Sequence, residues 1–114
     1  MLPFRLMLSG VTRANRFEVT AAIDDAVAAS GGWIDGHTLL SNIATIFRFV
    51  VPAGQLHRLM ERMAEAHVTM DPESLALVAA ATGRPPETEQ AGSIAVTFIH
   101  DEPDLRRDVP AVPG

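Results

Sequence analysis

Residues 43–63 read IATIFRFVVPAGQLHRLMERM, an alternating apolar segment that leads directly into an amphipathic one. Ile43–Val51 alternates between two faces, and both faces are largely apolar. Such a pattern is typical of a central strand or of a strand that is covered on both sides. Pro52 suits the first position of a helix, and apolar residues then recur at helical spacing. The stretch therefore predicts a buried strand followed by a helix that ends near His67.

The N-terminal part of the chain shows the same order of elements. Residues 4–9 alternate between apolar and other residues, which predicts a half-buried strand ended by Gly10. Asn15 is the predicted cap of a first helix, with Glu18 as its capping-box partner. This helix is expected to extend to about Ser30.

Two further strands and a short helix complete the predicted elements. Residues 33–41 predict the second strand, with a bulge or bend at Asp35-Gly36 because glycine weakens strand interiors. The segment 71–82 begins with the start signals of a helix: a cap, a proline and an acid. Residues 84–92 are polar and proline-containing and predict an exposed loop, after which residues 93–100 predict the last strand.

This order of elements predicts an α+β fold, a ferredoxin-like βαββαβ sandwich. We expect a four-stranded antiparallel sheet in the order last, first, third and second strand, with two main helices on one face. Residues 1–100 would form one domain with an inserted helix and loop at 68–92, and residues 101–114 a proline-rich, extended C-terminal tail. The predicted core is apolar and consists of Phe4, Leu6, Leu8, Val19, Ile23, Val27, Phe47, Phe49, Leu56, Leu59, Met60, Met63, Val96 and Phe98.

In this topology, and in the Ser9-Gly10 end of its first strand, the chain resembles the ACT-like branch of ferredoxin-like domains. The resemblance covers about residues 4–67 and 93–100. Members of that branch are small regulatory modules that dimerise through sheets or helices and often bind amino acids. The resemblance implies a ligand at the loop after the first strand, where small residues admit it.

Composition limits the chemistry that this chain supports. The 114 residues include no Cys, no Tyr and no Lys, and all nine basic residues are Arg. Disulfides, thiolate nucleophiles, Cys-based metal sites and lysine Schiff bases are therefore excluded. The net charge of −5 argues against general nucleic-acid binding, which favours a basic excess.

The chain contains no apolar run long enough to cross a membrane, and its first residues lack the pattern of a signal peptide. We therefore expect a cytoplasmic protein with no membrane partner.

One face of the expected sheet lacks helices and needs a cover. It mixes aliphatic side chains with two guanidinium groups, and its predicted interface residues are Arg5, Met7, Ile46, Arg48, Val50, Thr97 and Ile99. Left bare, this face would be a larger apolar patch than monomers usually expose. A second copy of the chain, the tail from Asp101, and a ligand or foreign partner are the alternatives, with a homodimer as the simplest.

The loop between the first strand and the first helix is the candidate ligand site. A helix N-terminus presents free N–H groups and the positive end of the helix dipole. Two arginines add planar donors, so the loop predicts binding of a small anion such as a carboxylate. The predicted ligand-binding residues are Ser9, Gly10, Thr12, Arg13, Asn15 and Arg16. The alternative is that Asn15 only caps the helix and that both arginines are solvated.

No metal, cofactor or catalytic residue is predicted. The four histidines have no metal-site spacing, and the serines at strand ends belong to no nucleophile motif. The ACT-like resemblance, the βαββαβ pattern and the two-sided apolar third strand motivate the leading functional hypothesis, a small ligand-binding or regulatory module that works as a homodimer. The alternative is a protein-interaction or assembly subunit that uses the open sheet face and the tail.

Overall fold

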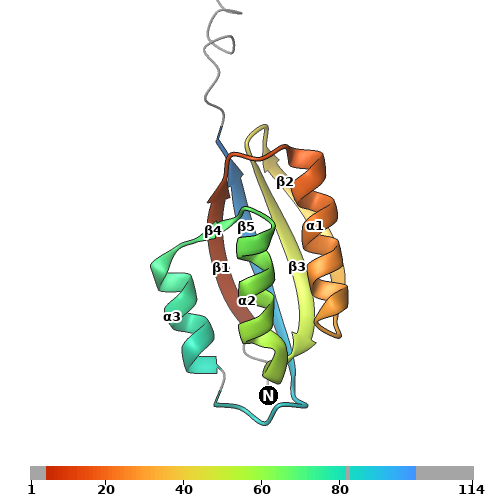
Figure 1. The fold of residues 1–114 in the computed structure, drawn as a ribbon, viewed down its shortest axis with the longest axis vertical. Coiled ribbons are helices and arrows are strands. Elements are labelled where there is room, and N and C mark those ends of the chain that lie inside the picture. The colour runs from red at the N-terminus through yellow and green to blue at the C-terminus, as the bar shows by residue number, and fades with distance from the viewer. Residues whose placement is uncertain (1–4, 82, 100–114) are drawn as a thin grey trace, which may run out of the picture.

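The computed structural model describes residues 5–81 and 83–99, which form one five-stranded sheet and three α-helices. In chain order the elements are β1 (Arg5–Thr12), α1 (Arg16–Ala29), β2 (Trp33–Ser41), β3 (Ala44–Pro52), the 3₁₀ turn η1 (Ala53–Gln55), α2 (Leu56–Glu65), β4 (Thr69–Met70), α3 (Pro72–Ala81) and β5 (Glu89–Phe98). Helices α1 and α2 lie over the same face of the sheet, and α3 packs along the β1 side (Figure 1). The fold is therefore α+β, as predicted.

The local signals in the sequence are mostly confirmed. The Asn15 Oδ1 atom accepts hydrogen bonds from the backbone N–H groups of Phe17 and Glu18, so Asn15 caps α1. The register of β2 against β3 shifts between Ile34 and Gly36, which places the predicted bulge at Asp35. Helix α3 begins after Asp71 at Pro72.

The predicted order of the strands is wrong. The sheet has the order β2-β3-β5-β1-β4, so the last strand lies between the first and the third instead of at an edge. Strand β5 is parallel to β1 and antiparallel to β3, and therefore the sheet is mixed rather than antiparallel. The expected four-stranded ferredoxin-like topology is replaced by a five-stranded one with a central last strand.

The inserted segment explains this arrangement. The prediction assigned the outer side of β1 to the last strand, but β4 and α3 occupy that side. Thr69 and Met70 pair with Val11 and Gly10, and α3 continues along the same edge. The chain then returns to the opposite end of the sheet, and β5 enters between β1 and β3, where it finds a pairing partner on each side.

Three predicted boundaries also change. Pro52 is the last residue of β3 and not the first of a helix, because the turn η1 follows it and α2 begins at Leu56. Gly10 does not end the first strand, because β1 continues to Thr12. Residues 89–92 belong to β5 and not to an exposed loop, since they pair with β3 from Phe49 to Pro52, and Ala91 and Gly92 also pair with Arg5 and Leu6 of β1. The error in β1 came from treating Gly10 as a strand break, and the error in β5 from extending the polar, proline-containing loop as far as Gly92.

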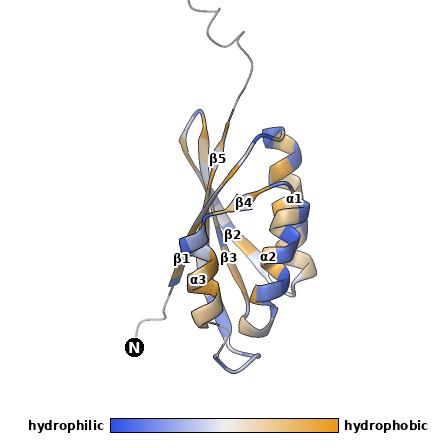
Figure 2. Ribbon diagram, turned by 60° about the vertical axis from the view of Figure 1, so that its left-hand side comes forward, coloured by the Kyte–Doolittle hydropathy of each residue, from blue (hydrophilic) through white to orange (hydrophobic). Residues whose placement is uncertain are grey.

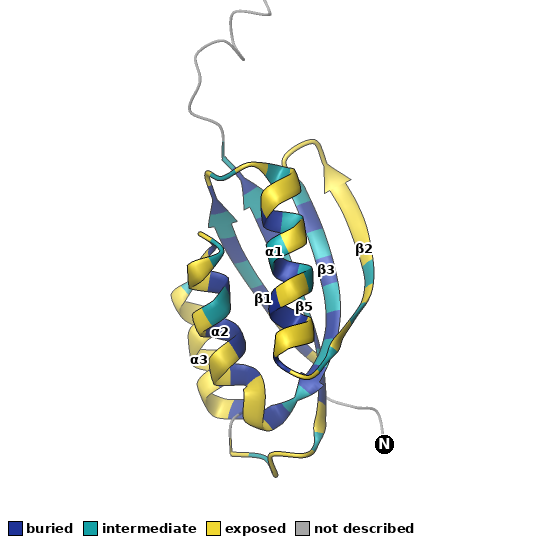
Figure 3. Cartoon of the chain, turned by 45° about the vertical axis from the view of Figure 1, so that its right-hand side comes forward, coloured by how far each residue is buried: buried dark blue, intermediate teal, exposed yellow. Residues whose placement is uncertain are grey.

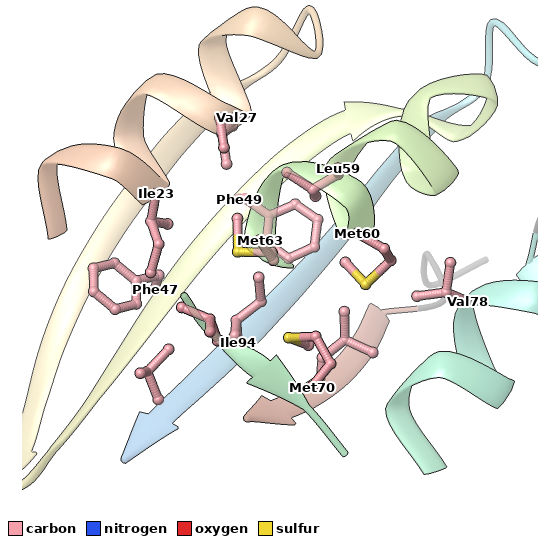
Figure 4. Packing of buried hydrophobic residues seen from close by; sticks show 14 of the residues in the cluster. Ile23, Val27, Phe47, Phe49, Leu59, Met60, Met63, Met70, Val78 and Ile94 are labelled. Atoms are coloured by element: carbon pink, nitrogen blue, oxygen red, sulfur yellow. The ribbon is translucent and has the colours of Figure 1, made fainter. Parts of the chain in front are cut away.

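The core lies between the sheet and the helices α1 and α2, as Figure 4 shows. Every predicted core residue within the described part is buried, whereas Phe4 lies outside it. The cluster also includes residues of the inserted segment, among them Val68, Met70 and Val78. The insertion is therefore part of the same core and not an appendage.

Candidate interaction surface

The face of the sheet opposite α1 and α2 is a regular grid of side chains. Residues of β2, β3, β5 and β1 that are paired across the sheet form four rows on this face. The rows are Trp33-Val50-Ala91-Arg5, Gly36-Arg48-Ser93-Met7, Thr38-Ile46-Ala95-Ser9 and Ser41-Ala44-Thr97-Val11. Figure 2 shows the sheet with α1 and α2 together on one side and this face on the other. We call these four rows the open face.

The open face is mainly aliphatic and small, and its two charged groups are both guanidinium groups. Most of its residues on β3 and β5 are half-buried, whereas the Met7 side chain is 73% exposed. Arg48 Nη1 donates to Thr38 Oγ1 at 2.7 Å, and a Cβ at Gly36 would lie 2.8 Å from Arg48 Nη2. Arg5 Nη1 lies 3.5 Å from the carbonyl oxygen of Gly92. The Arg48 guanidinium therefore lies over β2, and the Arg5 guanidinium lies over β5. Both side chains follow the surface of the sheet, so the face is flat.

The predicted interface residues all fall on this side of the sheet. Arg5, Met7, Ile46, Arg48, Val50 and Thr97 belong to the four rows. Ile99 follows β5, is half-buried, and donates its backbone N–H to the carbonyl oxygen of Thr12 at 2.8 Å. The tail from Asp101, one of the alternative covers for this face, lies outside the described residues.

Two of the predicted ligand-loop residues stabilise the first turn of α1 and its contact with the β2–β3 hairpin. Asn15 uses its side-chain oxygen to cap the helix, as described above. Arg16 Nη1 donates to Thr45 Oγ1 at 3.3 Å, and Nη2 donates to the carbonyl oxygen of Asn42. The Arg16 guanidinium also stacks over the Phe98 ring, 4.7 Å from its centroid. These contacts connect α1 to the sheet, while Arg13 is exposed on the same loop.

The remaining predicted ligand residues face the inserted segment. Thr12 Oγ1 donates to the carbonyl oxygen of His67 at 2.7 Å and accepts the backbone N–H of Ala14 at 3.1 Å. Gly10 packs closely against β4, because a Cβ at this position would lie 2.8 Å from the carbonyl oxygen of Thr69. Thr12 and Gly10 are therefore in close contact with His67 and Thr69 of the inserted segment.

Sequence reasoning missed the junction between Ser9 and the first turn of α3. The Ser9 backbone N–H donates to Ser74 Oγ at 2.8 Å, and the Asp71 backbone N–H donates to the Ser9 carbonyl oxygen at 2.9 Å. The Ser9 hydroxyl donates to an Asp71 carboxylate oxygen. The sequence shows only that Ser74, a polar residue, directly precedes the apolar residues 75–81 of α3. Its partner lies 65 positions away, so no local pattern identifies it.

The main hollows of the described surface lie between the helices and at the end of the sheet where β3 leads into α2. A groove of about 440 Å³ between α2, β4 and α3 is lined by Met60, Ala64, His67, Val68, Thr69, Met70 and Leu75. Hollows of about 280 and 350 Å³ lie between α1 and α2 and beside Gly31 and Pro86. All three are shallow and open to solvent.

Among residues 5–81 and 83–99, no cluster of three His, Asp or Glu side chains is placed to hold a metal ion. None of the helices described is both long and apolar enough to span a membrane. His37 lies 3.3 Å from the Asp24 carboxylate and contacts the Phe47 ring edge-on, so it packs between α1 and the sheet.

No protein-family model, curated protein or solved structure matches this chain. Its function must therefore be argued from its own surfaces.

Proposed function

We propose that this domain is an assembly module, in which a second copy of the chain packs on the open face. The observation that supports this is the four-row grid, whose residues face away from α1 and α2. A broad flat face of aliphatic and small side chains suits another protein surface better than a small molecule, which prefers a concave site. Contiguous exposed apolar patches of this kind mark interaction sites.

The sizes of the side chains on the open face favour packing against another sheet. The central strand β5 presents small residues, Ala91, Ser93 and Ala95, beside the larger residues Val50, Arg48 and Ile46 of β3. Small side chains at the centre of the face allow a second sheet to approach to the usual spacing of about 10 Å between packed sheets.

The charge pattern favours a two-fold arrangement. Arg5 and Arg48 lie in the two rows nearest the start of β1, while the other two rows carry no charged residue. A two-fold axis near Ile46 and Ala95 would bring the uncharged rows together and keep the guanidinium groups of the two copies apart. Such a self-complementary contact is the commonest form of homodimer.

Substitution of Ile46 by Glu tests the proposal. Ile46 lies near the proposed axis, and a carboxylate there would be desolvated without a partner, so Ile46→Glu should lower the mass in solution. Sedimentation velocity at micromolar protein measures the mass, and circular dichroism checks that the fold is retained. Leu39→Glu is the matched control, because Leu39 is 64% exposed and faces the helix side of β2.

An unchanged mass for a folded Ile46→Glu variant would reject the open face as the contact. Deletion of residues 101–114 separates the alternative occupants. A gain in mass on deletion means that the tail covers the face, and retention of the mass leaves a second copy as the cover.

The small-anion function predicted from the loop at Ser9–Arg16 has less support. The backbone donors that Asn15 caps, and the Arg16 guanidinium, already have partners within the chain. Anion binding and a regulatory role therefore remain predictions, which thermal shift with carboxylates and phosphates would test.

A further inference from the structure

The exposed surface of helix α3 differs from that of the amphipathic helix α2. Its residues from Leu75 to Ala81 are all apolar, yet only Ser74, Val78 and Ala81 are buried. Figure 2 shows hydrophobic residues around the helix, and Figure 3 shows that much of its surface is exposed. A helix that is apolar all round is typical of a buried position.

Helix α2 provides the comparison within the same molecule. It buries Leu56, Leu59, Met60 and Met63, and its exposed side carries the charged or polar residues His57, Arg58, Glu61 and Glu65. Water therefore faces charged groups on α2, whereas it faces Leu and Ala on α3. The two leucines of α3 remain 46% and 41% exposed, at Leu75 and Leu77 respectively.

One stripe of α3 combines this apolar surface with charges at both ends. Glu73, Leu77 and Ala80 follow one another at i, i+4 and i+7 and therefore share a face of the helix. Arg84 lies just beyond the C-terminal end and, with Leu77, Ala80 and Ala81, lines a hollow of about 210 Å³. No charged residue lies between Glu73 and Arg84.

We infer that this stripe is a self-association surface, on which α3 of a second copy packs antiparallel. A two-fold axis that crosses the helix between Val78 and Ala79 relates position 77 to position 80, so Leu77 meets Ala80 of the second copy. The same axis brings the N-terminal end of one stripe, with Glu73, next to the C-terminal end of the other, beyond which Arg84 lies. In this register a large side chain meets a small one, and an acid lies beside a base.

The geometry of α3 suits this pairing. The helix has ten residues and is about 15 Å long, so the contact is short and needs both the apolar centre and the charged ends. Glu73 also lies in the first turn, where the helix dipole favours a negative charge. This surface is separate from the open face, and its test does not depend on that proposal.

Leu77→Glu tests the contact in the full-length chain. It places a carboxylate in the centre of the stripe, so the dissociation constant of the α3 contact should rise by about tenfold or more and the mass should fall. Leu75→Glu is the matched control, because Leu75 is equally apolar and similarly exposed but lies on the opposite flank of α3. Its mass should equal that of the wild type.

Charge reversal tests the register itself. Glu73→Arg should weaken association because it places two arginines opposite each other, and Glu73→Arg combined with Arg84→Glu should restore it. Circular dichroism on each variant checks the fold. Folded Leu77→Glu protein with wild-type mass would overturn the inference, and so would equal losses for Leu75→Glu and Leu77→Glu. If the double reversal fails to restore the mass that Glu73→Arg lowers, the antiparallel register is wrong.

These results are distinguishable from a failure of the open face. Ile46→Glu reports on the sheet contact alone, because Ile46 lies on β3 and α3 packs along β1. A mass that responds to Leu77→Glu but not to Ile46→Glu would support the α3 contact and reject the other.

Discussion

Gly92 shows how a single missing side chain positions the central strand. A Cβ at Gly92 would lie 2.6 Å from Cζ of Phe49 and 3.1 Å from the carbonyl oxygen of Leu6. Phe49 is fully buried and cannot move away freely. We therefore expect Gly92→Ala to lower the free energy of unfolding by about 1–3 kcal/mol through overpacking, as measured by urea denaturation.

Gly83→Ala is the control for this prediction, because nothing lies within 4 Å of a Cβ at Gly83. That variant should leave stability unchanged or raise it slightly, since alanine restricts the unfolded chain more than glycine does. Equal stability of the two variants would mean that the Phe49 ring does not constrain β5.

At the scale of elements, the first turn of α3 takes the place of a strand at the outer edge of β1. Ser74 Oγ accepts the Ser9 backbone N–H, and the Asp71 backbone N–H donates to the Ser9 carbonyl oxygen. Unpaired edge groups of this kind otherwise invite pairing with other chains. Ser74→Ala should leave the Ser9 donor without its acceptor and lower stability by about 1–3 kcal/mol.

Hydrogen exchange at Ser9 separates this local effect from global unfolding. The Ser9 amide should lose protection in Ser74→Ala by more than the amides of β3 do. Ser93→Ala, which removes a hydroxyl from the open face on β5, should leave Ser9 protected. Unchanged exchange at Ser9 in the Ser74→Ala protein would show that this bond contributes little to closing the edge.

At the scale of the whole molecule, the two proposed self-association surfaces have a combined consequence. Two different two-fold contacts generate either a closed tetramer or an open chain of copies, depending on how their axes meet. Each single variant, Ile46→Glu or Leu77→Glu, should therefore form a dimer, and the double variant should be a monomer. Light scattering across a dilution series measures these masses. A double variant as large as either single one would show that a third surface joins the copies.

The sequence alone was sufficient to predict the three helices, four of the five strands and most of their buried faces, but not the short strand β4. Strand alternation, helical spacing and the Asn15 cap are set by backbone geometry within a few residues, and the described core contains the residues that these patterns indicated. The face on which Ile46 and Arg48 lie follows from the same alternation. These properties are local, and therefore a single chain reveals them.

The tertiary structure alone decided which strands are neighbours and which side chains meet. Segments far apart in the chain compete for the two edges of β1, and β4 with α3 takes the outer one. The close fit of Gly92 against Phe49 and the bond between Ser9 and Ser74 depend on that outcome. No periodicity encodes such a competition, because its result depends on the sizes and hydrogen-bonding groups of residues that meet only after folding.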